Sequence, residues 1–216
     1  MRSTDPYARL AGLYDRFVEP MMAGVRRVAL DVVPPSSHWS VLDVGCGTGN
    51  GMVGYVEAGC SVVGVDVSPS MVERAKAKLA GGADIRLIGQ GPIPLDAGSF
   101  DLVTTSMVLH EVPAAQRLDL VRDMARLTRS GGRILVTDFR FGSLRGWRGP
   151  VFRIINRLVE RVSGHYDGYL SFKAGGGVPG LLEHTGLEVE REKIVAGGNI
   201  ALYVISTNDS DHHPQG

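Results

Sequence analysis

Two apolar runs carry the clearest chemistry in this sequence, one ending in glycines and the other in a carboxylate. The first, V-L-D-V-G-C-G-T-G-N at residues 41–50, places Asp43 just before three alternating glycines. Glycine allows positive φ and lets the backbone approach a ligand where a Cβ would collide. The second, V-V-G-V-D at 62–66, ends in Asp66, whose carboxylate can accept hydrogen bonds from both hydroxyls of a ribose. Together they predict a site for a nucleoside-containing molecule.

The elements that must position these runs alternate between strands and helices. Strands are expected at 40–45, 61–66, 84–88, 100–105, 133–138, 187–195 and 200–206. Helices are expected at 5–30 with a break at Pro20, at 49–58, from Ser68 to about 80, from Pro113 to the turn at 130–132, at 144–162 and at 177–185. Such alternation predicts a parallel sheet with helices on both faces. The turn G-G-N at 197–199 is too short for a crossover, so the last two strands should form an antiparallel hairpin.

Composition indicates a globular chain with no general affinity for nucleic acid. The 216 residues suit one domain, and the 23 basic residues equal the 23 acidic ones. Two cysteines make no disulfide framework, and no apolar run is long enough to span a bilayer, so we expect a cytoplasmic protein without a transmembrane segment. Residues 208–216 should be a disordered tail, and we expect no metal site at its paired histidines, His212 and His213.

The motif D-V-G-C-G-T-G at 43–49, together with Asp66, resembles the first two motifs of the class I S-adenosylmethionine-dependent methyltransferases. Three later segments extend the resemblance in order and spacing: S-F-D-L-V at 99–103, M-V-L-H-E-V at 107–112 and L-T-R-S-G-G-R at 127–133. The resemblance covers most of residues 40–140 and implies S-adenosylmethionine as the cofactor.

The fold implied by this resemblance is α/β: a Rossmann-like, seven-stranded, mostly parallel sheet with one antiparallel strand and helices on both faces. It implies a single methyltransferase domain over residues 1–207. An N-terminal helical cap is expected at 1–36 and a cap insertion after the fifth strand at 139–175.

The main rival for such a glycine turn is a dinucleotide-dependent dehydrogenase. A G-x-G-x-x-G pattern does occur at residues 49–54, but its register is wrong. The first glycine of the dinucleotide motif closes the turn directly after the strand, so that the helix N-terminus meets the pyrophosphate. Here Gly49 should already enter the helix. The sequence therefore favours a methyltransferase.

The resemblance implies a set of cofactor-binding residues gathered at the carboxyl ends of the strands. They are Tyr14, Asp43, Gly45, Cys46, Gly47, Asp66, Val67, Met71, Gln90, Gly91, Ser106 and Met107. The glycine turn should line the methionyl part, with Asp43 as an acid for its positive charges. Val67 and Met71 should flank the adenine, the alternative being plain core packing. Tyr14 should belong to an N-terminal segment folded over the cofactor, or else be a helix-to-core tyrosine.

One position departs from the family pattern. Many members place an aspartate after the third strand to bind the adenine amino group, whereas this chain has G-Q-G at 89–91. The amide oxygen of Gln90 can accept the same hydrogen bond. A neutral amide makes a weaker contact than a carboxylate, so adenine recognition should be weaker or altered.

Methyl transfer requires no dedicated catalytic residue. It is an in-line displacement at carbon, and positioning alone can supply roughly 7–11 kcal/mol of such a barrier. A base helps if the acceptor is a phenol, a protonated amine or an acidic carbon. His110 and Tyr166 are the two candidate catalytic residues. The alternatives are a structural histidine in the strand-to-helix turn for His110 and an ordinary surface loop for 165–169.

The insertion after the fifth strand bears on the acceptor. Its apolar positions follow helical spacing: Val151, Ile154, Ile155, Leu158 and Val162. The opposite face carries Arg153, Asn156, Arg157, Glu160 and Arg161. We expect a helix whose apolar face packs over the active site, with its arginines in solvent. The alternative is an interfacial helix touching anionic lipid, a peripheral membrane contact.

The ending, L-L-E-H-T-G-L at 181–187 and A-G-G-N-I-A-L at 196–202, is similar to the quinone-biosynthesis branch of the family, the UbiE-like methyltransferases. The expected function is S-adenosylmethionine-dependent methyl transfer to a small, lipophilic acceptor: a quinol- or phenol-like molecule or a lipid amine. The alternative is a non-catalytic, regulatory S-adenosylmethionine-binding domain.

Overall fold

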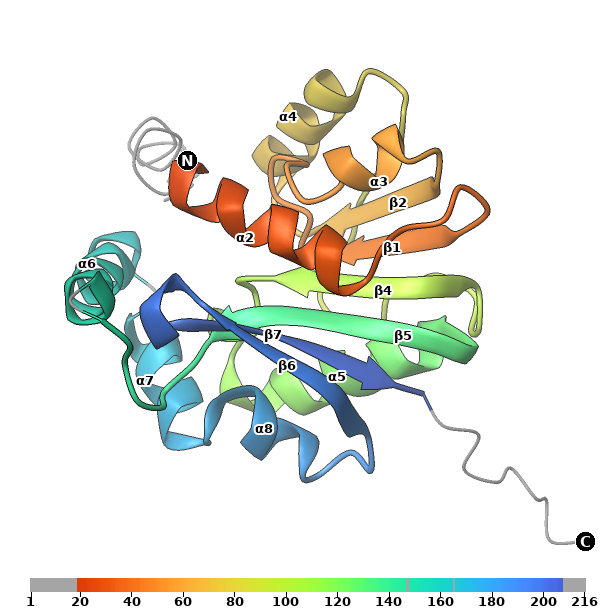
Figure 1. Ribbon diagram of the computed structural model, residues 1–216. Helices are drawn as coiled ribbons and strands as arrows, with labels where there is room; N and C mark the ends of the chain where they lie inside the picture. Colours follow the sequence, from red (N-terminus) through yellow and green to blue (C-terminus); the bar gives the residue numbers. More distant parts are fainter. Residues whose placement is uncertain (1–18, 147, 165, 208–216) are drawn as a thin grey trace, which may run out of the picture.

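The computed structural model describes residues 19–146, 148–164 and 166–207, and its centre is one seven-stranded sheet (Figure 1). The strand order is β3-β2-β1-β4-β5-β7-β6. The strands are β1 (Ser40–Val44), β2 (Ser61–Asp66), β3 (Asp84–Leu87), β4 (Phe100–Ser106), β5 (Thr128–Phe139), β6 (Glu188–Val195) and β7 (Ile200–Ser206). Only β7 runs antiparallel to its neighbours, β5 and β6. The predicted fold and its final hairpin are therefore confirmed.

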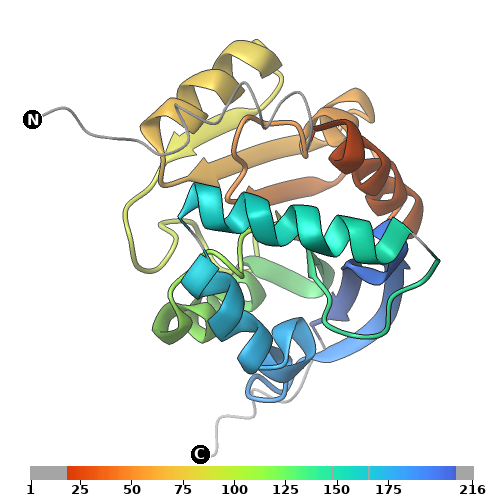
Figure 2. The same cartoon turned by 90° about the vertical axis from the view of Figure 1, so that its left-hand side faces the viewer.

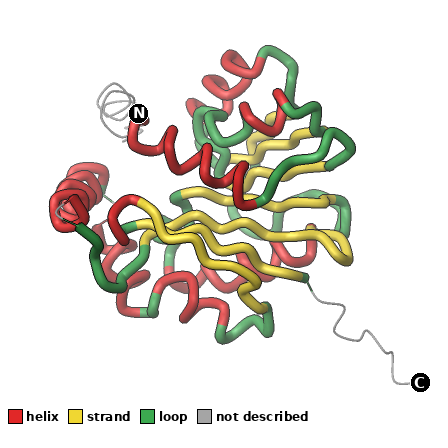
Figure 3. The backbone as a smooth tube through the Cα atoms, viewed as in Figure 1, coloured by secondary structure: helices red, strands yellow, loops and turns green. Residues whose placement is uncertain are grey.

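The helices surround this sheet, as the tube view shows (Figure 3). They are α2 (Glu19–Val32), α3 (Val53–Glu57), α4 (Pro69–Leu79), α5 (Ala114–Leu127), α6 (Arg148–Ser163), α7 (Tyr166–Ala174) and α8 (Gly177–Leu182), with a short 3₁₀ turn η2 (Ala196–Gly198). Pro20 lies in the first turn of α2, where its missing N–H leaves no helical hydrogen bond unmade.

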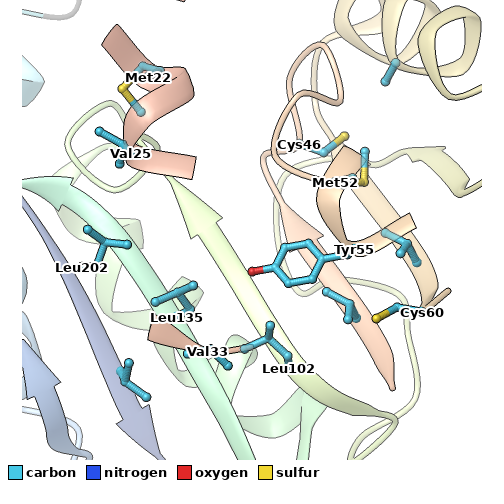
Figure 4. Close-up of a cluster of buried hydrophobic side chains, with 14 of the residues drawn as sticks. Met22, Val25, Val33, Cys46, Met52, Tyr55, Cys60, Leu102, Leu135 and Leu202 are labelled. Atoms are coloured by element: carbon cyan, nitrogen blue, oxygen red, sulfur yellow. The ribbon is translucent and has the colours of Figure 1, made fainter. Parts of the chain in front are cut away.

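A hydrophobic core lies on each face of the sheet, because consecutive strand residues point to opposite faces. Val41 packs with side chains of α2, α3 and α4, whereas its neighbour Leu42 packs with side chains of α5, α7 and α8. Figure 4 shows the first core, where Tyr55 of α3 lies between Cys46 and Met52 on one side and Leu135 of β5 on the other.

The predicted start of the helix after β1 and the predicted end of α5 are wrong, the first because glycines adopt positive φ and the second because Thr128 is already extended. The first helix after β1 begins at Val53 rather than 49, since Gly47 and Gly49 have φ of 53° and 82° and form a turn instead. Helix α5 ends at Leu127, not at the glycines 131–132. Strand β5 begins at Thr128, and its pairing with β4 shifts register across residues 129–132, where Gly131 has a φ of 70°.

Helix α6 lies across the carboxyl edge of the parallel strands (Figures 1 and 2). The strand order reverses beside β1, since β2 lies on one side of it and β4 on the other. In open α/β sheets the carboxyl ends of the strands at such a point form a crevice that binds ligands. None of the helices within the described ranges is long and apolar enough to cross a membrane.

The predicted orientation of α6 fails at two positions, although Arg157 and Arg161 are exposed as expected. Ile154, expected to face the protein, is 67% exposed. Arg153, expected in solvent, is half-buried and donates its Nε to Asn199 Oδ1 at 3.1 Å, and Glu160, assigned to the same face as the arginines, is 6% exposed. Residues 153 and 160 are seven apart and so share a helix face. Arg153 bonds to Asn199 and to the carbonyls of Arg140 and Gly142, and Glu160 lies 3.6 Å from His110, so polar contacts hold this face of α6 inward.

Candidate functional site

The glycine turn after β1 combines one tightly packed position with one open position. A Cβ on Gly45 would lie 2.5 Å from Val108 Cγ2, in the segment after β4. A Cβ on Gly47 would meet nothing within 4 Å among the described residues. The amides of Gly45 and Cys46 donate to the carbonyl of Val65 at 2.9 and 3.0 Å, which joins the turn to β2. The open backbone at Gly47 is a place where a ligand can approach.

Asp66, at the end of β2, is half-buried and holds two backbone amides. Its Oδ2 accepts from Gly47 N and its Oδ1 from Ser68 N, both at 2.8 Å. Each carboxylate oxygen keeps a further lone pair, because an ionised carboxylate has about four acceptor sites. Asp66 can therefore fix the glycine turn and still accept ribose hydroxyls.

Asp43 lies beneath the turn, only 4% exposed. A Cβ on Gly51 would lie 3.0 Å from its Oδ2, so only glycine leaves this carboxyl its present position. Burial first and the charge of Asp66 second raise the pKa of Asp43 to about 7. Near neutral pH this carboxyl is therefore only partly ionised, and a cation placed beside it would favour the ionised form.

The remaining expected cofactor residues lie around the turn with differing exposure. Val67 is 62% exposed, which rules out core packing for this side chain, and Met71 is half-buried on α4. Ser106 and Met107 are half-buried at the end of β4, and Met107 donates its amide to Thr137 O at 2.8 Å. Gln90 and Gly91 are exposed in the loop after β3, while Tyr14 lies outside the described residues.

These features fit a nucleoside cofactor. Gly47 leaves open space above its backbone, Asp66 has spare acceptor capacity, and Val67 presents an apolar surface beside it. Cys46 is buried in the turn, where burial and the charges of Asp43 and Asp66 raise the pKa of its thiol. The thiol thus packs as a neutral group rather than acting as a nucleophile.

His110 lies in a buried polar cluster that the sequence did not reveal. It is 1% exposed, and its Nδ1 lies 2.7 Å from Asp138 Oδ1 at the end of β5. Its Nε2 lies 3.6 Å from Glu160 Oε1 on α6 and 3.9 Å from Glu111 Oε1. Burial disfavours the charged imidazolium, but Asp138, Glu160 and Glu111 outweigh it and raise the pKa of His110 to about 10. The side chain is therefore a protonated imidazolium at neutral pH.

Arg117 of α5 fixes the backbone around His110. It is 5% exposed and donates to the carbonyls of Leu109 and Val112 at 2.9 Å, of His110 at 3.3 Å and of Gly168 at 2.8 Å. The only signals in the sequence were an arginine on the buried side of a helix and the aspartate that ends R-I-L-V-T-D. Neither identifies its partner, because these contacts join residues far apart in the chain.

The segment after position 165 is helix α7, not the surface loop that was the alternative for it. Tyr166 is half-buried, and its ring stacks on Tyr169 with centroids 6.2 Å apart. The guanidinium of Arg161 lies 4.6 Å from the centre of the Tyr166 ring. Tyr166, the first residue of α7, thus contacts both Tyr169 of its own helix and Arg161 of α6.

Sheet topology and site geometry together define a class I S-adenosylmethionine-dependent methyltransferase. A family model described as "Methyltransferase domain" matches residues 41–132. A structure of a SAM-dependent methyltransferase from Aquifex aeolicus superposes with a TM-score of 0.65 at 17% identity, covering 94% of this chain and 98% of that one. The mitomycin 7-O-methyltransferase MmcR superposes with a TM-score of 0.59 at 21% identity, covering 79% of this chain and 49% of that one.

Similarity in sequence to known proteins identifies the family of the chain. An uncharacterized methyltransferase of Synechocystis sp. is 30% identical over 84% of this chain and 82% of its own length. A demethylmenaquinone methyltransferase of Beutenbergia cavernae is 30% identical over 82% of this chain and 78% of its own. The nocamycin O-methyltransferase of Saccharothrix syringae is 38% identical over 67% of this chain and 54% of its own. The chain belongs to the S-adenosylmethionine-dependent methyltransferases, and not to the dinucleotide-dependent dehydrogenases.

Proposed function

We propose that this methyltransferase acts on a small, lipophilic acceptor, a quinol- or phenol-like molecule or a lipid amine. The observation that carries the proposal is the similarity, over most of both chains, to a protein named as a demethylmenaquinone methyltransferase. A Geobacter ubiquinone/menaquinone biosynthesis C-methyltransferase, 24% identical over 92% of this chain and 93% of its own, supports it. The name of the nocamycin O-methyltransferase supports methyl transfer to oxygen as one form of the reaction.

In this proposal the turn after β1 and the end of β2 hold the cofactor. Gly45, Cys46 and Gly47 line its methionyl part, and Asp43 lies under the positive charges. The carboxylate of Asp66 takes the ribose hydroxyls. Adenine lies against Val67 and Met71, with Gln90 and Gly91 at its edge. The role of Tyr14 in cofactor binding stays a prediction.

When bound, S-adenosylmethionine supplies a methyl group on a sulfonium, already a good leaving group. The protein must then orient the acceptor in line with that methyl group and exclude water, which can supply much of the barrier reduction. Ser106 and Met107, at the end of β4, lie where the two substrates would meet. His110 and Tyr166, proposed as catalytic from the sequence, lie at the same edge, but both ring nitrogens of His110 already face carboxylates.

The position of α6 supports a small acceptor rather than a macromolecule. The helix crosses the carboxyl edge of the sheet and would close over the acceptor (Figure 2). Its outward positions include exposed Ile154, Arg157 and Arg161, a mixture that suits the surface of an anionic membrane. A lipophilic acceptor could then enter from lipid.

The test begins with calorimetric titration of S-adenosylmethionine, S-adenosylhomocysteine and NAD in parallel. Saturable binding of the first two alone is expected. Methyl transfer from radiolabelled cofactor is then measured with quinols, phenols and lipid amines presented in detergent, beside a water-soluble catechol and a peptide as polar controls. Transfer only to the polar controls would overturn the proposed acceptor class while leaving the methyltransferase assignment intact.

A further inference from the structure

A buried bridge of three ionisable side chains connects α6 to the floor of the site. Asp138 comes from the end of β5, His110 from the segment after β4, and Glu160 from the inward face of α6. They are 0%, 1% and 6% exposed. The contacts from His110 are 2.7 Å to Asp138 and 3.6 Å to Glu160. The bridge thus spans the sheet and the helix that covers its edge.

The end of the bridge on the sheet is rigid. Asp138 also accepts the backbone amide of Phe139 at 2.7 Å and that of His110 at 3.3 Å. The hydrogen bonds from Arg117 hold the carbonyls on either side, and a Cβ on Gly168 of α7 would lie only 2.6 Å from His110 O. His110 therefore cannot move without displacing α5, α7 and β5.

The end of the bridge on α6 depends mainly on charge. Glu160 is the only acidic residue of α6, and it points inward while exposed Arg157 and Arg161 point out. A buried carboxylate needs a partner, because an uncompensated buried charge is strongly destabilising. The imidazolium of His110 places a positive charge beside that carboxylate, so it stabilises the closed position of α6 together with the hydrogen bonds of Arg153.

We propose that His110 is a positioning residue which, through Glu160, holds α6 over the acceptor. The proposal rests on the proposed function, since it assumes that the acceptor binds at the edge that α6 covers. It gives His110 a role other than proton acceptor. The enzyme would bind its acceptor more weakly without the bridge, while its affinity for the cofactor, held by β1 and β2, would not change.

Two conservative variants test this with the full-length protein. Glu160→Gln keeps the size of the side chain and removes its charge. His110→Asn keeps a donor for Asp138 but is too short to reach Glu160. Arg157→Gln, on the exposed face of α6, is the matched control. Hydrogen exchange of the peptides covering 148–163 measures closure of α6, and calorimetry measures cofactor affinity independently of any acceptor.

Faster exchange in α6 by roughly tenfold is expected in both variants, corresponding to about 1.4 kcal/mol, with unchanged cofactor affinity. The KM for the acceptor should rise while kcat changes little. The double variant should resemble either single variant, because both remove the same contact. Arg157→Gln should match the wild type in α6 exchange and in cofactor affinity.

Two results would overturn the proposal. One is unchanged α6 exchange in Glu160→Gln. The other is a large loss of kcat in His110→Asn at unchanged KM and exchange, which would mark His110 as a base. Alkaline pH gives a further readout, since deprotonation of His110 near pH 10 should open α6 in the wild type and not in His110→Asn. Among the described residues, Asp138, Glu160 and Glu111 are the charged groups that face this imidazole, while the guanidinium of Arg117 donates to the His110 carbonyl. If the wild type fails to bind S-adenosylmethionine, the proposed function fails, whereas the exchange measurement still decides the bridge.

Discussion

At the scale of single residues, Asp66 holds two backbone amides and is also proposed to bind the ribose. Asp66→Ala removes the acceptor for Gly47 N and Ser68 N as well as the proposed contacts to ribose. Hydrogen bonds to a charged group contribute about 1.5–3 kcal/mol each, so affinity for S-adenosylmethionine should fall by roughly tenfold or more. Titration calorimetry measures this loss. Asp84→Ala, an exposed acid on the neighbouring strand β3, should bind normally. Unchanged affinity in Asp66→Ala would refute the assignment.

Asp43 predicts a pH dependence of cofactor binding. Its pKa of about 7 in the free protein is raised by burial and by Asp66. A cation bound beside it favours the ionised form, so binding should release a proton at slightly acid pH and grow stronger as pH rises through 7. Titrations between pH 5.5 and 7.5, repeated in buffers of different ionisation enthalpy, count that proton. Asp43→Asn should bind with little pH dependence, and a wild type that behaves the same way would contradict the role.

Substitutions at Gly45 and Gly47 test two different effects, the packing of the turn and the approach of a ligand. Both have positive φ, 70° and 53°, where alanine costs about 1 kcal/mol. Gly45→Ala also collides with Val108, so it should lower the melting temperature most. Gly47→Ala should fold but lose cofactor affinity, since its methyl group fills the open space. Gly131→Ala, also at a φ of 70° with nothing within 4 Å, is the control for backbone strain alone. Wild-type affinity in Gly47→Ala would show that no ligand approaches there.

At the scale of secondary structure, the sequence predicted the elements that depend on a local pattern of residues. The strands and the hairpin at 197–199 were predictable because alternation and glycine turns act over a few residues. Asp43, Asp66 and Gly47 were predictable as a group because a strand-turn-helix unit places them together. The bridge from Glu160 to His110 was not predictable, because it joins positions 50 residues apart. The buried carboxylate of Glu160 also marks the face of α6 that turns inward, and the apolar pattern did not indicate this face.

The exposed arginines on the outward face of α6 predict that the protein binds anionic membranes. Arg157 and Arg161 should attract the protein to anionic vesicles, with roughly 1 kcal/mol for each arginine near the surface. Sedimentation with vesicles containing phosphatidylserine should show binding that salt weakens, and Arg157→Gln/Arg161→Gln should bind several-fold less. Arg122→Gln/Arg126→Gln on α5 removes the same charge from another helix and should leave binding unchanged. Equal binding to neutral vesicles would rule out this electrostatic attraction.

At the scale of the whole molecule, the site occupies the carboxyl edge between two halves of one sheet. The proposed cofactor residues lie at the ends of β1, β2 and β4, whereas the His110 bridge joins the β4–α5 loop, β5 and α6. A perturbation of the bridge should therefore affect the acceptor side first. It should also affect global stability, because its charges are buried in the core between β5, α6 and α7.

Global stability should accordingly fall as pH rises from about 7 to 10. The pKa of His110 is 6.5 for the free side chain and about 10 in the folded protein, so the folded state binds a proton that the unfolded state has lost. The stabilisation is fully present below pH 6.5 and is lost as pH passes 10, at about 1.4 kcal/mol for each pKa unit of difference. Urea unfolding at pH 6, 8 and 10 measures the free energy of unfolding. His110→Asn has no such proton, so its deficit relative to the wild type should be largest near neutral pH and shrink towards pH 10. Other groups that titrate in this range cancel in that difference, so a deficit independent of pH would mean that His110 is not held as an imidazolium.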